Sequence, residues 1–94
     1  MALQCTARRM APSGNGHEHI AYLWWKDPQN QEGCYTRDQM VAYVKQNGTA
    51  AVWCPDRAGG AGQWVHTNSN GRVEYVQTVA DKRWTDNLLA LPVR

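Results

Sequence analysis

The stretch TRDQMVAYVKQNG, residues 36–48, carries the clearest structural signals in the chain and sets the class of fold. Thr36 and Gln39 have the spacing of a capping box, in which the threonine hydroxyl accepts from the N–H of residue 39 and the glutamine side chain reaches back. Gly48 is placed to end the helix, because glycine adopts a positive φ without steric cost. The pattern predicts a helix from about Arg37 to Gln46.

The same stretch indicates which side of this helix is buried. Met40, Val41 and Val44 form an apolar stripe with Tyr43 at its border. Tyr35 stands before the cap and can pack against Met40 as a hydrophobic staple. A single helix of this length cannot enclose a core, so we expect it to lie on a β-sheet.

Strand patterns lie on both sides of the helix. Both faces of 19–25 are apolar, which suggests a strand that is covered on each side. The Asn70-Gly71 pair predicts a tight hairpin turn, and Val73, Tyr75 and Val79 would line the apolar face of its second strand. The expected strands are 3–10, 19–25, 49–54, 64–67 and 72–79, and the expected loops are 12–18, 26–34 and 55–62.

These elements predict one small α+β domain spanning residues 1–94, with its core between about 19 and 92. The expected order is β-β-α-β-β-β, with one helix packed on a mainly antiparallel sheet of about four to five strands. We expect a folded C-terminal tail, 80–94, that forms no strand. Its leucines, Leu88, Leu89 and Leu91, would seal one end of the core.

Composition narrows the class of protein further. Ninety-four residues leave room for one core, and a net charge of +2 gives no strong drive toward nucleic acid. No apolar run is long enough to span a bilayer or to act as an export signal, so we expect a cytoplasmic protein with no membrane partner. Cys5, Cys34 and Cys54 show no disulfide or zinc spacing, which fits reduced thiols.

The C-terminal segment resembles a known family. The stretches TVAD, 78–81, and WTDNLLALP, 84–92, are similar to the closing signature of short bacterial and bacteriophage proteins known only as a domain of unknown function. The resemblance extends over His19–Pro92 and implies a strand, a helix opened by Thr36 and a β-hairpin. It implies a prokaryotic or phage cytoplasm, and no activity. Lys82 replaces the glycine that often follows the aspartate, which argues against a positive-φ turn there.

The densest polar cluster is also in this segment and allows two interpretations. It could be a ligand-binding loop, since exposed loop residues on a rigid scaffold often carry recognition. Alternatively, Asp86 and Asn87 cap turns through their side chains, which we favour because it requires no ligand. The cluster comprises Asp81, Lys82, Arg83, Thr85, Asp86 and Asn87.

The sequence gives little indication of a metal site or a catalytic site. His17 and His19 would share one face of a strand, yet no closed set of four metal ligands is visible, so we expect no metal. No nucleophile, general base and orienting residue can be assigned together. Enzymatic activity stays open with a non-enzymatic role favoured, and we expect no cofactor.

The chain is rich in tryptophan and has no phenylalanine. Its indoles are Trp24, Trp25, Trp53, Trp64 and Trp84. Adjacent Trp24 and Trp25 must point to opposite faces of a strand, so only one of them can face the helix. Surplus indoles are typical anchors at protein interfaces.

We therefore expect a protein-binding module that docks on a host protein, or on a second copy, through a Trp-centred surface. The alternative is binding of a nucleotide or nucleic acid through Lys82, Arg83 and an exposed Trp. The candidate binding residues are Trp25, Lys82, Arg83, Trp84, Asp86 and Asn87.

Overall fold

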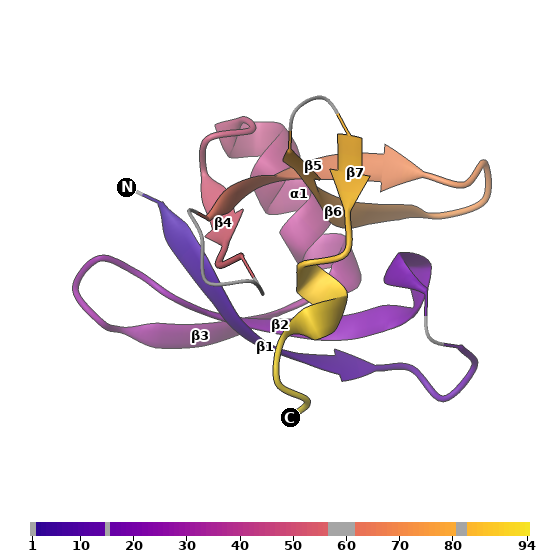
Figure 1. Cartoon of the computed structure of the whole chain (residues 1–94), viewed down its shortest axis with the longest axis horizontal. Helices are drawn as coiled ribbons and strands as arrows, with labels where there is room; N and C mark the ends of the chain where they lie inside the picture. Colours follow the sequence, from indigo (N-terminus) through magenta and orange to yellow (C-terminus); the bar gives the residue numbers. More distant parts are fainter. Residues whose placement is uncertain (1, 15, 57–61, 81–82) are drawn as a thin grey trace.

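A computed structural model describes residues 2–14, 16–56, 62–80 and 83–94 of the chain (Figure 1). Within these residues the chain forms seven strands, one α-helix and two short 3₁₀ helices. The strands are β1 (Leu3–Met10), β2 (Ile20–Lys26), β3 (Glu32–Thr36), β4 (Val52–Cys54), β5 (Gln63–Ser69), β6 (Glu74–Ala80) and β7 (Arg83–Thr85). The helices are η1 (His17–His19), α1 (Arg37–Asn47) and η2 (Leu88–Ala90).

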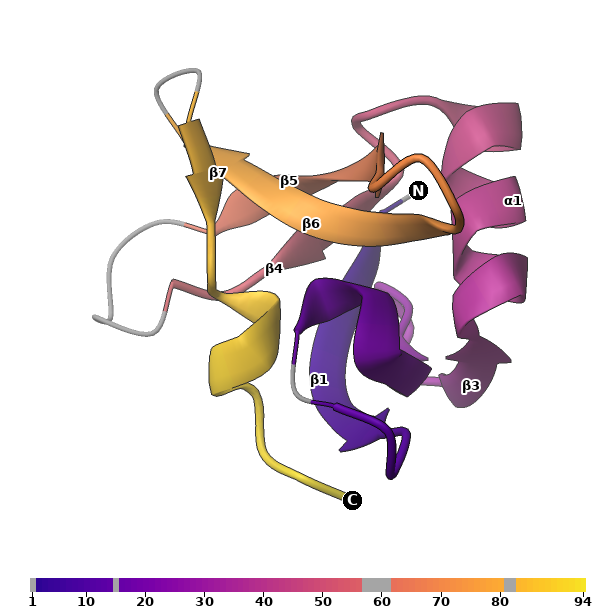
Figure 2. The same cartoon turned by 90° about the vertical axis from the view of Figure 1, so that its right-hand side faces the viewer.

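All seven strands belong to one curled sheet with the order β3-β2-β1-β4-β5-β6-β7. Neighbouring strands are antiparallel except for β1 and β4, which run parallel. The sheet curls so that β1–β3 form one layer and β5–β7 a second layer above it (Figure 1). The helix α1 stands beside both layers and covers one open side of the core (Figure 2).

The helix forms as its sequence predicts. Thr36 Oγ1 accepts from the N–H of Gln39, and the Gln39 side chain accepts from the N–H of Thr36, which completes the capping box. Gly48 follows the helix with φ of 93°. The predicted stripe is also confirmed, because Met40 is fully buried and Val41 and Val44 nearly so.

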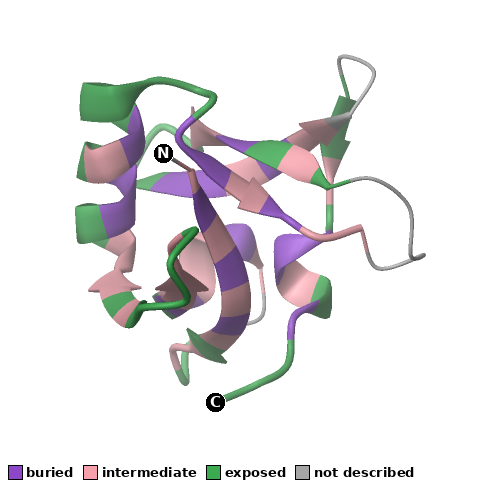
Figure 3. Cartoon of the chain, turned by 90° about the vertical axis from the view of Figure 1, so that its left-hand side faces the viewer, coloured by how far each residue is buried: buried purple, intermediate pink, exposed green. Residues whose placement is uncertain are grey.

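The core lies between the two layers and α1. β1 alternates buried and half-buried residues from Leu3 to Arg8, and the buried side of α1 faces the sheet (Figure 3). The C-terminal segment closes the core with Leu88 and Leu91, both buried, as expected from its leucines. The core residues are Leu3, Cys5, Ile20, Leu23, Met40, Val41, Val44, Ala51, Val52, Cys54, Val65, Val76, Leu88 and Leu91.

The expected number of strands was too low. The loop expected at 26–34 contains the start of β3. This strand pairs with β2, and Glu32 lies opposite Lys26 at one end while Thr36 lies opposite Tyr22 at the other. The tail expected to form no strand contains β7, which pairs with β6 through Val79 and Trp84. Both are short edge strands, and their positions depend on pairing with a neighbour.

The same tail also extends the sheet at β1. The N–H of Arg8 donates to the carbonyl of Pro92, and the N–H of Arg94 donates to the carbonyl of Arg8. Arg8 and Val93 form an isolated parallel bridge. Residues 92–94 therefore lie along the edge of β1 that β4 leaves unpaired.

Three local expectations also need correction. The hairpin turn is longer than an Asn-Gly pair, because Ser69 pairs with Glu74 and only Gly71 of the two turn residues has a positive φ. His17 and His19 lie in η1 and not on a strand. The outer face of β2 is only partly covered, since Tyr22 is 40% exposed.

No helix in the described ranges combines the length and apolar character needed to cross a membrane.

Candidate functional site

Three of the five tryptophans stand in one row across β4, β5, β6 and β7. Trp53 pairs with Trp64, and Val79 pairs with Trp84. The β5–β6 register, which pairs Val65 with Thr78, places Trp64 opposite Val79. Directly opposed residues share a sheet face, so Trp53, Trp64, Val79 and Trp84 form what we call the indole row. With neighbouring strands about 4.8 Å apart, the row is about 14 Å long.

The indole row lies on the outer face of this part of the sheet. Trp64 is 45% exposed and Trp84 is 50% exposed, whereas Val65, the next residue along β5, is fully buried. His66 meets Trp84 edge-on, with ring centroids 6.4 Å apart. Two large apolar rings on the sheet are therefore exposed to solvent.

A small hollow lies at the β4 end of the row. Ala2, Trp53, Gly62 and Trp64 line it, and its volume is about 240 Å³. A Cβ at Gly62 would lie 2.2 Å from the Trp53 ring, so glycine allows this indole to lie against the backbone. The hollow offers room for an apolar side chain from another molecule.

The C-terminal motif builds a buried polar network. Thr78 and Thr85 contact each other through their hydroxyl groups, and Thr85 Oγ1 donates to Gln63 Oε1 over 2.7 Å. Asn87 Nδ2 donates to the same Gln63 oxygen over 2.7 Å. Thr78 is fully buried and Asn87 is 5% exposed. The network fastens β5, β6 and β7 to η2, so these side chains hold the fold together.

Asn87 takes part in this network and does not cap a turn through its side chain as expected. The residue occupies the N-cap position of η2, but its side chain makes no capping hydrogen bond there. It reaches across to β5 instead. The structural interpretation of Asn87 is thus supported by a different contact from the turn cap that we expected.

The remaining residues of the polar cluster are dispersed. Asp86 is exposed, and its Oδ1 lies 4.0 Å from His17 Nε2. Arg83 is exposed in the edge strand β7. Asp81 and Lys82 lie outside the described residues.

Trp25 lies away from the indole row. Its ring packs against Tyr35, with centroids 5.1 Å apart, and against the hydrophobic core. A Cβ at Gly33 would lie 2.3 Å from this ring, so the indole occupies the space above the glycine. Its Nε1 is buried. Trp24, as expected, points to the opposite face of β2.

Burial shifts the pKa of His17 from its ordinary value. Its side chain is buried in η1, and loss of solvation lowers its pKa below the ordinary value of 6.5. The carboxylates of Asp86 and Glu18 oppose this shift. His17 is therefore held toward its neutral form.

Two of the three thiols are buried, and the third is exposed. All three cysteines are free, and burial raises the pKa of Cys5 far above its usual range and that of Cys54 to about 12. Cys34 is exposed. Among described residues, no three His, Cys, Asp or Glu side chains gather as metal ligands.

Two residues of these sites were not selected from the sequence. The sequence identifies Trp64 as one of five tryptophans but does not predict that it is exposed, because either face of β5 could pack on the core. The sequence does not indicate a role for Gln63, because its hydrogen bonds are to Thr85 and Asn87, which follow it by 22 and 24 positions.

Comparison with known proteins agrees with the resemblance to a domain of unknown function. The model of the family described as "Protein of unknown function (DUF3892)" matches residues 4–92. The match begins in β1 and thus extends further toward the N-terminus than the resemblance. No curated protein and no solved structure matches the chain. Because the family model covers nearly the whole sequence, this chain belongs to the DUF3892 family.

Proposed function

We propose that this protein is a non-enzymatic docking module that binds an apolar segment of another protein on the indole row. The observation that carries the proposal is the joint exposure of Trp64 and Trp84 on one sheet face. Tryptophan is enriched among the residues that dominate the energy of protein interfaces. Burying both rings would remove a large apolar area from water.

The shape of the row indicates how the segment binds. Along a helix, residues i, i+4 and i+8 span about 12 Å, close to the length of the indole row. One of these side chains would enter the hollow beside Trp53 while the others cover Trp64 and Trp84. An amphipathic helix with three apolar residues at this spacing is the partner segment that we propose.

The setting that we propose is the cytoplasm of a bacterium or of a phage-infected cell. Three free thiols in 94 residues support a reducing compartment. The resemblance of the C-terminal signature to bacterial and phage proteins supports the origin.

The test is affinity capture from bacterial lysate with wild type, Trp64→Ala and Trp84→Ala. Tyr22→Ala is the matched control, because Tyr22 is an exposed aromatic residue on another face. We expect both tryptophan variants to lose the captured protein. With purified partner, a loss of about 2 kcal/mol at such an anchor corresponds to a Kd weakened by about 30-fold.

Circular dichroism and thermal unfolding establish that each variant is folded. The proposal is wrong if folded Trp64→Ala and Trp84→Ala bind the partner as tightly as Tyr22→Ala. It is also wrong if the only species that covers the row is a second copy of the chain, seen as a dimer in sedimentation that both substitutions dissociate.

A further inference from the structure

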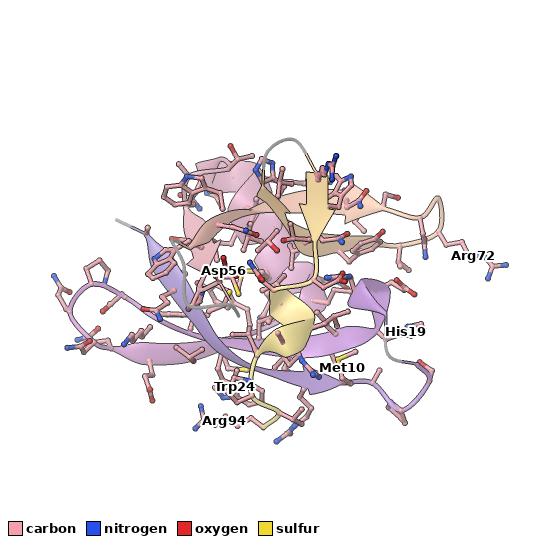
Figure 4. The ribbon with its side chains drawn as sticks, viewed as in Figure 1. Met10, His19, Trp24, Asp56, Arg72 and Arg94 are labelled. Atoms are coloured by element: carbon pink, nitrogen blue, oxygen red, sulfur yellow. The ribbon has the colours of Figure 1, made fainter. Side chains whose placement is uncertain are left out.

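A second aromatic surface lies on the outer face of β1 and β2, in the other layer of the sheet. The guanidinium of Arg9 lies 5.2 Å from the centre of the Trp24 ring, and that of Arg94 lies 5.1 Å from it. Tyr22 is 40% exposed, and its ring centroid is 6.3 Å from that of Trp24. Figure 4 shows Trp24 and Arg94 close together at the lower side of the molecule. We call Arg9, Tyr22, Trp24 and Arg94 the arginine–aromatic surface.

Among the described residues, both arginines keep guanidinium N–H groups without a partner at this surface. Arg9 donates through Nε and Nη2 to the main-chain oxygen of Arg94, so Arg9 uses two of its five N–H groups there. The Arg94 guanidinium has no hydrogen-bond or ion-pair partner among the described residues. No Asp or Glu carboxylate of the described residues pairs with either guanidinium. The acidic residue on this face, Glu32, stands opposite Lys26 at the far end of β2.

This combination has a definite chemical complement. A guanidinium that stacks on an indole can still donate from the edge of its plane, and such an edge fits a phosphate. Arg94 has this edge free among the described residues, and Arg9 keeps three N–H groups besides the two that bind Arg94. Tyr22 adds an exposed ring next to the two cations, on which an unpaired base can stack. Paired bases hide their faces in the duplex, so the surface favours single strands over double strands.

From this arrangement we infer that the arginine–aromatic surface binds single-stranded nucleic acid, with phosphates at Arg9 and Arg94 and a base on Tyr22. This activity lies beyond the docking function proposed for the indole row and uses different residues. It also differs from the nucleic-acid site expected at Lys82 and Arg83. With two cations and a net charge of +2, binding is weak and sensitive to salt.

The experiment is a fluorescence anisotropy titration of a labelled 12-nucleotide oligothymidylate and of the matching duplex at low salt. We expect saturable binding of the single strand and weaker binding of the duplex. Arg9→Gln and Arg94→Gln should each weaken binding and lower the slope of log K against log salt by about 0.7, the value for one phosphate contact. Tyr22→Ala should raise the Kd by about fivefold or more.

Arg72→Gln is the matched control, because it removes one exposed arginine at the far tip of the β5–β6 hairpin (Figure 4). It should leave binding of the oligonucleotide unchanged. The inference is overturned if Arg72→Gln weakens binding as much as Arg9→Gln, or if the oligonucleotide does not bind at about 50 mM salt. It is equally overturned if vesicles with anionic lipid bind and the oligonucleotide does not.

Reciprocal variants separate this inference from the docking function. Trp84→Ala should abolish capture of the protein partner and leave the oligonucleotide bound. Tyr22→Ala should do the reverse. If both variants weaken oligonucleotide binding equally, the arginine–aromatic surface is not the site.

Discussion

Thr78, Thr85, Asn87 and Gln63 show how much a few buried polar side chains contribute. Asn87→Ala removes the amide that donates to Gln63 and leaves a small cavity, so we expect a loss of about 1–3 kcal/mol of stability. Asp86→Asn is the control, because this neighbouring side chain is exposed. Urea unfolding of both variants measures the difference. Equal stability of the two variants would show that the network contributes little.

His17 predicts how stability depends on pH. Its folded pKa is lowered below 6.5, so between these two values the unfolded chain binds more protons than the folded one. The contribution of His17 is complete above pH 6.5 and is lost as the pH falls below it. Urea unfolding between pH 5 and 7.5 should show stability decreasing toward acid, with a smaller decrease in His17→Gln. An identical pH profile for wild type and variant would contradict this assignment.

For single residues, the sequence predicts whether a side chain has a structural role better than it predicts which residue that side chain contacts. The polar residues of the C-terminal motif suggested a structural role for Asn87, and this agrees with its burial. The partner, Gln63, could not be predicted because the hydrogen bond crosses from β5 to the segment after β7. The exposure of Trp64 was equally hidden, since it depends on which side of β5 meets the core.

Among the elements, α1 was predictable and the edge strands were not. The helix depends on local signals, and Thr36, Gln39 and Gly48 lie within its own sequence. β3 and β7 depend on pairing with β2 and β6 and contain few apolar residues, so they resemble loops in the sequence. The turn between β5 and β6 is longer than the tight turn that the Asn70-Gly71 pair predicts, because Asn70 does not adopt a positive φ there. Its Oδ1 accepts from the N–H groups of Arg72 and Val73 instead.

Gly33 provides a direct test of how β3 packs. A Cβ at this position would lie 2.3 Å from the Trp25 ring, so Gly33→Ala must displace the indole or move the strand. We expect a loss of about 1–3 kcal/mol, as for other overpacked sites, and a red shift of tryptophan fluorescence. Gly71→Ala is a useful comparison: nothing lies near its Cβ, although its positive φ also disfavours alanine. An unchanged emission spectrum in Gly33→Ala would contradict this packing.

For the whole molecule, closure of the core depends on the C-terminal segment. Leu88 is fully buried between the layers, and Leu88→Ala should cost about 2–5 kcal/mol through the cavity that it leaves. Such a loss is a large part of the free energy of unfolding of a typical domain, which is about 5–15 kcal/mol. Thermal unfolding of this variant and of Val93→Ala, which alters an exposed residue of the same segment, provides the comparison. A similar melting temperature for both variants would exclude a core role for the segment.

The curled sheet gives the molecule two separate aromatic surfaces. The indole row lies on the layer of β4–β7, and the arginine–aromatic surface lies on the layer of β1 and β2. The first is mainly apolar and the second is basic, so the two surfaces differ in the chemistry that they recognise. The two proposals together predict that the domain holds a protein and an oligonucleotide at the same time.

The most direct test of the docking function is the accessibility of each indole with and without the captured partner. Incorporation of 5-fluorotryptophan gives five ¹⁹F resonances, which single Trp→Phe variants assign. In the free protein we predict solvent exposure at Trp64 and Trp84 and shielding at Trp25. When the partner binds, the signals of Trp64 and Trp84 should lose their exposure while that of Trp24 stays unchanged. Full exposure of Trp64 and Trp84 in the complex would contradict docking on the indole row.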